Sequence, residues 1–390
     1  MDHRAEKGNF TTFSYNKPIA QSTTIAITNL YTVRILIDIG HPAHVHFFRN
    51  PIKLLSERGH KILILSREKE CTLDLLNEYS LDHISISSQG GNGIASLARE
   101  LIARNLRLGK IAREFRPHIM AAIGGVSIAQ VGRFLGIPSV VFYDTENARL
   151  QNAITYPFAH LVVVPRCYSS WVPRRRHTKY NGYHELSYLA PRYFEPNRVI
   201  AVANGVSEKS DTFFIRVVSW QASHDVGEQG WSLSILEKLT YKLEQIGVVI
   251  ISSEMDLPES LDRFKYKGRL SEVHHVLAYC RAYIGESATM ASECAVLGIP
   301  AIYAATTGRG YTDEQEKLYK MVRNVRLLDW SILEREVDQL LEYDSKHWLR
   351  ARQSMLSHMT DVTKYVVKVL EDYPYVGDQA ESLSEIEKHS

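Results

Sequence analysis

Short runs of β-branched and aliphatic residues alternate with longer amphipathic segments along most of the chain. In the first half these runs occupy residues 33–40, 61–66, 84–87, 119–125, 137–144 and 161–165, and in the second half 213–219, 248–253, 282–285 and 301–304. The segments between them repeat apolar residues at the spacing of a helix face. Because parallel strands need crossover connections, this alternation predicts two successive α/β units, each built on a parallel sheet.

The remaining segments suggest how the chain is divided. Residues 1–31 are rich in Ser and Thr, and we expect a disordered extension there and a disordered tail at 374–390. The polar, Tyr-rich segment 166–211 is expected to connect the two units, which we place at 32–205 and 206–343. A last helix within 344–373 is long enough to return to the first unit.

Composition narrows the class of protein. The 390 residues are 45% hydrophobic and 23% charged with a net charge of +2, so bulk charge gives no drive toward nucleic acid. No apolar run approaches the roughly 20 residues that span a bilayer. The four cysteines have no paired spacing, which argues against a zinc framework and favours the cytoplasm. The basic segment 97–115 is interpreted as a solvated helix face, with contact to anionic membrane lipid as the alternative.

The stretch GESATMASECAVLGIPAIY, residues 285–303, carries the most chemistry. A small-residue turn that enters a helix presents unpaired backbone N–H groups, which suit a phosphate or diphosphate. Ser287 is a good N-cap, Thr289 lies in the first turn, and Glu286 stands at the mouth. Glu293 leans back toward the same end, where its two oxygens could hold a ribose diol. The alternative is a capped core helix with no ligand.

This stretch resembles the nucleotide-sugar motif of GT-B glycosyltransferases and of the related non-hydrolysing UDP-GlcNAc 2-epimerases. The resemblance assigns phosphate to Ser287 and ribose to Glu293, ahead of the segment Leu-Gly-Ile-Pro at 297–300. Gly268, in the segment 266–270, resembles the loop whose backbone contacts the uracil edge.

The first half resembles the peptidoglycan GlcNAc transferase. His44 falls where that enzyme has its first loop, and Gly124 and Gly125 fall in its acceptor loop. The chain departs from that pattern in two places: His41-Pro42-Ala43 replaces a glycine-rich run, and Asp144 with Glu146 replaces a single glutamate. Overall the chain is most similar to an uncharacterised archaeal and bacterial GT-B-like family with a D-I-x-x-P-x-H-V-x-F-F opening. That likeness covers about residues 33–370.

Three further residues follow from the same resemblance. His224 lies in a loop where the epimerases place a histidine near the phosphates, and Arg309 and Gln315 lie where GT-B proteins contact donor phosphate and sugar. For each, an ordinary polar loop or helix cap is the alternative.

We therefore expect a GT-B fold and an inverting, metal-independent glycosyltransferase that uses a UDP-linked sugar as substrate and needs no cofactor. The second unit would hold the nucleotide, and the first would hold a glycan or lipid-linked acceptor through His41 and His44, with Asp144 or Glu146. His44 is the expected general base, because a histidine titrates near working pH. Nucleic acid is not expected as a partner. Peripheral contact with the inner face of a membrane stays the alternative interpretation of the basic segment 97–115.

Three alternatives stay open. The first is a 2-epimerase on the same scaffold, whose catalytic carboxylates the sequence does not identify. The second is a metal-dependent hydrolase in which His41, His44 and His46 bind metal with Asp38, Asp144 or His224. The third is a binding protein without catalysis. Outside the hydrolase hypothesis, we expect His46 to lie on the surface of a helix.

Overall fold

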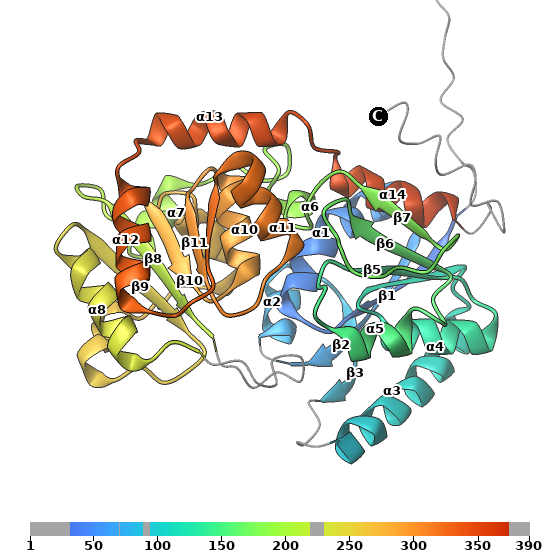
Figure 1. The fold of residues 1–390 in the computed structure, drawn as a ribbon. Helices are drawn as coiled ribbons and strands as arrows, with labels where there is room; N and C mark the ends of the chain where they lie inside the picture. Colours follow the sequence, from blue (N-terminus) through green and yellow to red (C-terminus); the bar gives the residue numbers. More distant parts are fainter. Residues whose placement is uncertain (1–31, 70, 89–93, 219–229, 374–390) are drawn as a thin grey trace, which may run out of the picture. The chain divides into compact units, whose positions relative to one another are not determined.

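The computed structural model describes residues 32–373 apart from 70, 89–93 and 219–229. Two sheets account for the strands in this part of the chain, and in both every neighbouring pair is parallel (Figure 1). The expected disordered ends and His224 lie outside the described residues.

The N-terminal half is built on a seven-stranded sheet in the order β3-β2-β1-β4-β5-β6-β7. Its strands are β1 (Arg34–Ile39), β2 (Lys61–Glu68), β3 (His83–Ser88), β4 (Ile119–Ile123), β5 (Ser139–Phe142), β6 (Leu161–Pro165) and β7 (His177–Tyr180). Its helices are α1 (Pro42–Glu57), α2 (Thr72–Glu78), α3 (Ile94–Phe115), α4 (Val126–Leu135), α5 (Arg149–Thr155) and α6 (Leu186–Leu189). Helix α7 (Arg198–Ala203) follows α6 in the chain and packs against α9 (Val273–Leu277) of the C-terminal half.

The C-terminal half is built on a five-stranded sheet in the order β12-β11-β10-β8-β9. Its strands are β8 (Thr212–Val217), β9 (Val248–Ser253), β10 (Ala282–Gly285), β11 (Ala301–Ala304) and β12 (Val322–Val325). Its helices are α8 (Leu233–Glu244), α9 (Val273–Leu277), α10 (Ala288–Leu297), α11 (Gly310–Glu314), α12 (Trp330–Leu341) and α13 (Ser345–Leu356). Helix α14 (Val362–Asp372) follows them in the chain.

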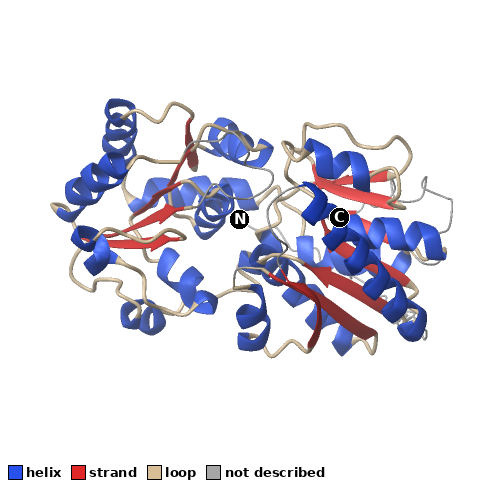
Figure 2. Cartoon of the chain, turned by 90° about the horizontal axis from the view of Figure 1, so that it is seen from below, coloured by secondary structure: helices blue, strands red, loops and turns tan. Residues whose placement is uncertain are grey.

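Strand β1 shows why the first sheet is buried on both faces. Successive side chains of a strand point to opposite faces. Ile35 and Ile37 accordingly pack into one core with α1, α2 and α14, and Leu36 packs into another with α3 and α4. Helices therefore cover the sheet on both sides, as Figure 2 shows for both sheets.

Asp38 lies on the same face of β1 as Leu36, and it accounts for the position of α3. The guanidinium of Arg104, on α3, donates to the Asp38 carboxylate and to the hydroxyl of Ser87. Both members of the ion pair are buried. Arg104 lies one and two helical turns before the buried residues Leu108 and Ala112, so one side of α3 faces the sheet.

The segment expected as a plain connection carries structure of its own. It contributes β7, which pairs with β6, as well as α6 and α7. Strand β7 has the sequence His-Thr-Lys-Tyr, which lacks the apolar run used to predict strands, because it is the edge of the sheet.

The single helix expected at the end of the chain is two helices, α13 and α14. Asp361 caps α14 by accepting from the backbone of Lys364, so a new helix starts there. Helix α14 does return to the first half, where Thr363 donates to the carbonyl of Ser187 over 2.6 Å. None of the helices described here is long and apolar enough to cross a membrane.

Candidate functional site

The carboxyl ends of strands from both halves bring the predicted site residues together. Glu146, which follows β5, accepts at Oε2 from the backbone N–H of Gly310 over 3.2 Å. Ser292 of α10 donates to Oε2 of Glu185 over 2.9 Å. Because Glu146 and Glu185 belong to the N-terminal half and Gly310 and Ser292 to the C-terminal half, these two bonds join the halves, next in the chain to the predicted residues Arg309 and Glu293.

A histidine that the sequence analysis missed forms a dyad with Asp144. The Nδ1 atom of His184 lies 3.0 Å from Asp144 Oδ2, and both side chains are largely buried. Burial opposes the charged carboxylate, but the adjacent His184, the Thr145 hydroxyl and Arg309 together lower the pKa of Asp144. In the neutral ring, an Nδ1–H that donates to Asp144 leaves the lone pair on Nε2. This Nε2 is buried and has no hydrogen-bond partner among the described residues. The only cue to His184 in the sequence was its place in a Tyr-rich segment expected to be a linker.

Two further carboxyl groups near Asp144 differ from it in pKa. Burial raises the pKa of Glu146, although the Gly310 N–H works in the other direction. Burial, followed by the charge of Asp144, raises the pKa of Glu185 to about 8. Environments that push neighbouring carboxyl pKa values apart are typical of sites that transfer protons.

Glu185 predicts how stability depends on pH. In the folded protein Glu185 keeps its proton up to a pKa of about 8, whereas in the unfolded chain it loses the proton near the ordinary glutamate pKa of 4.5. Its contribution to stability is therefore full below pH 4.5 and is lost as pH rises toward 8. Urea unfolding of wild type and of Glu185→Gln between pH 4.5 and pH 8 measures this contribution to the free energy of unfolding. We expect wild type to lose stability relative to the variant by up to about 1.4 kcal/mol per pH unit. Parallel pH profiles for the two proteins would contradict this assignment.

The hydrogen bond of His44 places the ring proton on Nε2, where a general base would need a lone pair. Its Nδ1 accepts from the backbone N–H of Gly40 over 3.3 Å, so the neutral ring carries its proton on Nε2. Burial, followed by the charges of His41 and Lys69, holds the pKa of His44 well below its usual value. The geometry therefore favours a neutral hydrogen-bond donor. His41 is the N-cap of α1 and accepts from Ala43, and its ring centroid is 5.7 Å from that of His44.

The expectation that His46 lies on the surface is wrong, since only 7% of it is exposed. Its ring stacks on Tyr188 and meets His274 edge-on, with centroids 5.2 and 4.7 Å apart. Burial, followed by the charge of His274, holds the pKa of His46 well below its usual value. Within the described ranges no group of three or more His, Cys, Asp or Glu side chains is placed to hold a metal ion. The hydrolase alternative therefore has no ligand set there.

Glu293, the predicted ribose ligand, is buried and already bonded. Its Oε1 accepts from the Tyr188 hydroxyl over 2.7 Å and lies 2.9 Å from Nε2 of His274. Tyr188 belongs to α6 of the N-terminal half, so this bond joins the halves. A ribose that binds Glu293 would have to share or replace these partners.

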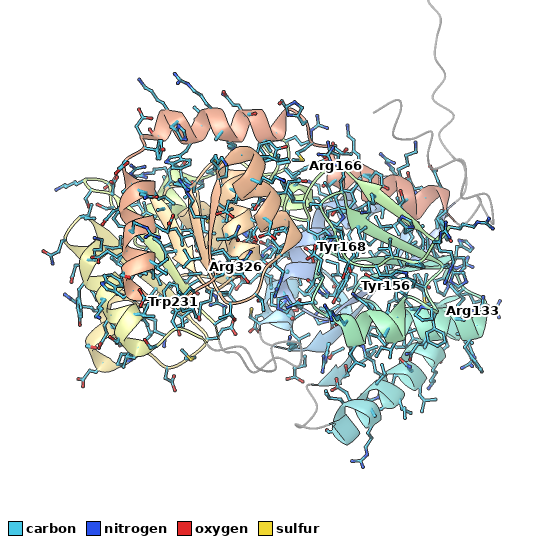
Figure 3. The ribbon with its side chains drawn as sticks, viewed as in Figure 1. Arg133, Tyr156, Arg166, Tyr168, Trp231 and Arg326 are labelled. Atoms are coloured by element: carbon cyan, nitrogen blue, oxygen red, sulfur yellow. The ribbon has the colours of Figure 1, made fainter. Side chains whose placement is uncertain are left out.

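The other polar residues of the opening stretch have separate roles. Glu286 accepts from the backbone N–H groups of Val218 over 3.0 Å and Trp231 over 2.7 Å, which anchors both ends of the β8–α8 connection. Trp231, which is labelled in Figure 3, in turn donates from its indole to the carbonyl of Ala304. Ser287 caps α10 by accepting from Met290 over 3.3 Å. Thr289 is half-buried in the first turn. The sequence thus placed Ser287 correctly as a cap, and the contacts of Glu286 are those of a structural anchor.

The three glycines predicted as site residues lie where the backbone is tightly packed or has a positive φ. Gly124 and Gly125 both have positive φ, at 73° and 52°, and Gly125 is the N-cap of α4. That backbone conformation favours glycine. A Cβ on Gly268 would collide with the side chains of Asn204 and Tyr266. These constraints explain the glycines through local packing and leave their predicted ligand contacts as predictions.

Arg309 and Gln315 both lie in the interior near the same centre. Arg309 donates to Thr307 and to the carbonyl of Gly308, and its charge is one cause of the low pKa of Asp144. Gln315 donates to Ser292 over 2.8 Å, and Ser292 donates to Glu185, so three side chains form a directed chain. Oε1 of Gln315 is buried and has no hydrogen bond to the described residues.

Comparison with known proteins identifies the family. The sequence model of the family described as "Protein of unknown function (DUF354)" matches residues 33–325. The chain belongs to this family. An uncharacterized protein of Methanocaldococcus jannaschii, MJ0665, is 24% identical over 280 residues, which cover 69% of this chain and 80% of that protein.

Solved structures show the fold of this DUF354 protein. The UDP-N-acetylglucosamine 2-epimerase of Rickettsia bellii matches with a TM-score of 0.65 and 11% identity over 89% of this chain and 98% of its own. The UDP-GlcNAc 2-epimerase of Neisseria meningitidis, bound to UDP-GlcNAc, has a TM-score of 0.61 and 10% identity over 87% and 100%. CalG4, the calicheamicin glycosyltransferase, has a TM-score of 0.57 and 12% identity over 89% and 99%. The fold is GT-B, as expected from the sequence, and its neighbours include glycosyltransferases and epimerases.

Proposed function

We propose that this protein is a glycosyltransferase that moves a sugar from a UDP-sugar to a glycan or lipid-linked acceptor. The observation that carries the proposal is the meeting of two different groups at one place. A proton-transfer cluster around Asp144 comes from the N-terminal half, and the α10 motif with Ser287 and Glu293 comes from the C-terminal half. The named structural neighbours that act on or bind UDP-sugars support it.

The C-terminal half would hold the donor. The N-terminus of α10, with Ser287 and Thr289, suits the diphosphate, because it combines hydroxyls with the positive end of the helix dipole. Glu293 would bind the ribose after exchanging its bond to Tyr188. Arg309 carries a positive charge close to Asp144, where negative charge on a departing diphosphate would be stabilised.

The N-terminal half would activate the acceptor. As the acceptor hydroxyl oxygen bonds to the anomeric carbon, its proton passes to Nε2 of His184. The bond from that carbon to the diphosphate oxygen breaks, and its electron pair leaves with UDP. Asp144 holds the ring in the required tautomer and stabilises the cation that forms. His44, as a neutral donor, is suited to bind an acceptor oxygen.

A UDP-sugar 2-epimerase is the second candidate. The observation that favours it is the gathering of Asp144, Glu146 and Glu185, whose pKa values are shifted in opposite directions. In an epimerase these groups would act as the acid and base for proton transfer at the sugar ring, which the sequence did not identify.

Proton NMR of UDP-sugar incubations separates these functions. A transferase releases UDP in proportion to a glycosylated acceptor, and little without one. An epimerase forms the C2 epimer with no acceptor present. We expect acceptor-dependent release that persists in a chelator, because the proposal uses no metal or other cofactor. If a panel of UDP-sugars, tested with glycan and lipid-linked acceptors, gives neither a glycosylated acceptor nor a C2 epimer, both assignments are contradicted.

A further inference from the structure

The outer face of three helices in the N-terminal half exposes large apolar side chains among basic ones. We name it the α3–α5 face, and it comprises the exposed residues of α3, α4 and α5. On α3, Ile102 and Leu106 are 61% and 71% exposed, while Phe134 on α4 is 82% and Leu150 at the start of α5 is 78% exposed. Single exposed hydrophobics are ordinary, but several large ones on adjoining helices mark an interaction surface.

The three helices lie side by side, so these side chains share one surface. Asn105 of α3 donates to Gln130 of α4 over 2.8 Å, and Gln130 donates to the carbonyl of Ile154 in α5 over 3.1 Å. The opposite sides of these helices pack on the sheet through a core that includes Leu108, Ile128 and Ala129. Figure 1 shows the three helices grouped on one side of the N-terminal sheet.

The charges on this face have one predominant sign. Its exposed basic residues are Arg99, Arg107, Lys110, Arg113, Arg133 and Arg149. Helices α4 and α5 contain no acidic residue, and on α3 Glu100 is paired with Arg67, leaving Glu114 as the exposed acid. The whole chain has a net charge of only +2, so the basic character is concentrated here. Figure 3 shows Arg133 at the outer edge of this half.

We propose that the α3–α5 face binds the surface of an anionic lipid bilayer. Apolar side chains that project among cations are suited to enter the acyl boundary while the cations meet lipid phosphates. Nucleic acid would use the cations alone and would leave Leu106, Phe134 and Leu150 in contact with water. The inference does not depend on the reaction catalysed. If the acceptor is lipid-linked, this face would keep the enzyme beside it.

Co-sedimentation of the full chain with vesicles tests the proposal. Vesicles of phosphatidylcholine are compared with vesicles that also contain phosphatidylglycerol, at low and high salt. We expect binding to the anionic vesicles that weakens as salt rises. Each basic residue near an anionic surface strengthens binding about five-fold, so Lys110→Glu/Arg133→Glu/Arg149→Glu should weaken it roughly 100-fold or more.

Matched variants separate this surface from general effects. Leu106→Ser/Phe134→Ser/Leu150→Ser should weaken binding by a factor that is about the same at low and at high salt. Exposed residues elsewhere provide the controls Val199→Ser/Leu318→Ser/Leu327→Ser and Lys209→Glu/Lys317→Glu/Lys346→Glu, which should bind as wild type does. Circular dichroism confirms that each variant is folded, and turnover with a water-soluble acceptor should be unchanged in all of them.

Several results would overturn the proposal. One is equal vesicle binding by all variants, and another is binding that does not depend on lipid charge. A third is tighter binding to an oligonucleotide than to vesicles. A fourth is a wild-type dimer that the α3–α5 variants convert to a monomer. If wild type shows no transferase activity on soluble acceptors, that result counts against the proposed function and leaves the membrane proposal unaffected.

Discussion

Replacing His184 with glutamine is expected to lower kcat by about 10²–10⁴-fold and to leave UDP affinity close to that of wild type. The reason is that the bond to Asp144 leaves Nε2 of His184 without a hydrogen-bond partner among the described residues, and the proposal assigns this atom as the proton acceptor. Asp144→Asn should have a similar effect, because an amide can no longer stabilise the imidazolium. Steady-state kinetics, with calorimetry for UDP, separates turnover from binding.

His160→Gln is the matched control for this experiment. His160 is a half-buried histidine of the N-terminal half, whereas His184 is buried, and His160 accepts from the backbone of Ser139 at the other end of the sheet. It should keep wild-type turnover. His44→Gln should raise KM for the acceptor more than it lowers kcat, because it displaces a hydrogen-bond donor and removes no base. Full activity of His184→Gln, or a base-loss pH profile in His44→Gln alone, would return the catalytic role to His44.

Replacing Asp38 with alanine is expected to destabilise the protein by about 3–5 kcal/mol. The change leaves the buried guanidinium of Arg104 without its carboxylate, although its bond to Ser87 remains. Burial, opposed by the charge of Arg104, raises the pKa of Asp38, as expected where an unpaired charge is disfavoured. Urea unfolding measures the loss.

The double variant Asp38→Leu/Arg104→Met is the control. Replacing both members of a buried ion pair by apolar groups of similar size is often close to neutral, so most of the stability should return. If the double variant is as unstable as Asp38→Ala, the ion pair is not what fixes α3 to the sheet.

The fold could be predicted because periodicity reports burial. Runs such as 33–40 and 61–66 are apolar since their strands are covered on both faces, and these became β1 and β2. Strand β7 escaped prediction because an edge strand needs no such run. The break between α13 and α14 was also missed, since Asp361 caps a new helix only once the chain has turned.

The site was predictable where its residues are close in sequence and less so where they are brought together by the fold. Ser287 was identified as a cap because capping depends on local sequence. From the sequence, Glu286 and Glu293 were equally good candidates to bind a ligand. In the structure Glu286 accepts from the backbone N–H groups of Val218 and Trp231, and Glu293 accepts from the Tyr188 hydroxyl. His184 became a candidate only when β7 placed it next to Asp144.

Whether a UDP-sugar binds at α10 through Glu293 decides the proposed function, and calorimetric titration of UDP measures this binding directly. Glu293→Gln keeps the shape of the side chain while removing the charge that the ribose would need. Tyr188→Phe removes only the hydroxyl that now bonds Glu293. We expect wild type to bind UDP, Glu293→Gln to lose most of that affinity, and Tyr188→Phe to bind at least as tightly as wild type. Failure of folded wild type to bind UDP, or equal affinity in Glu293→Gln, would contradict this expectation.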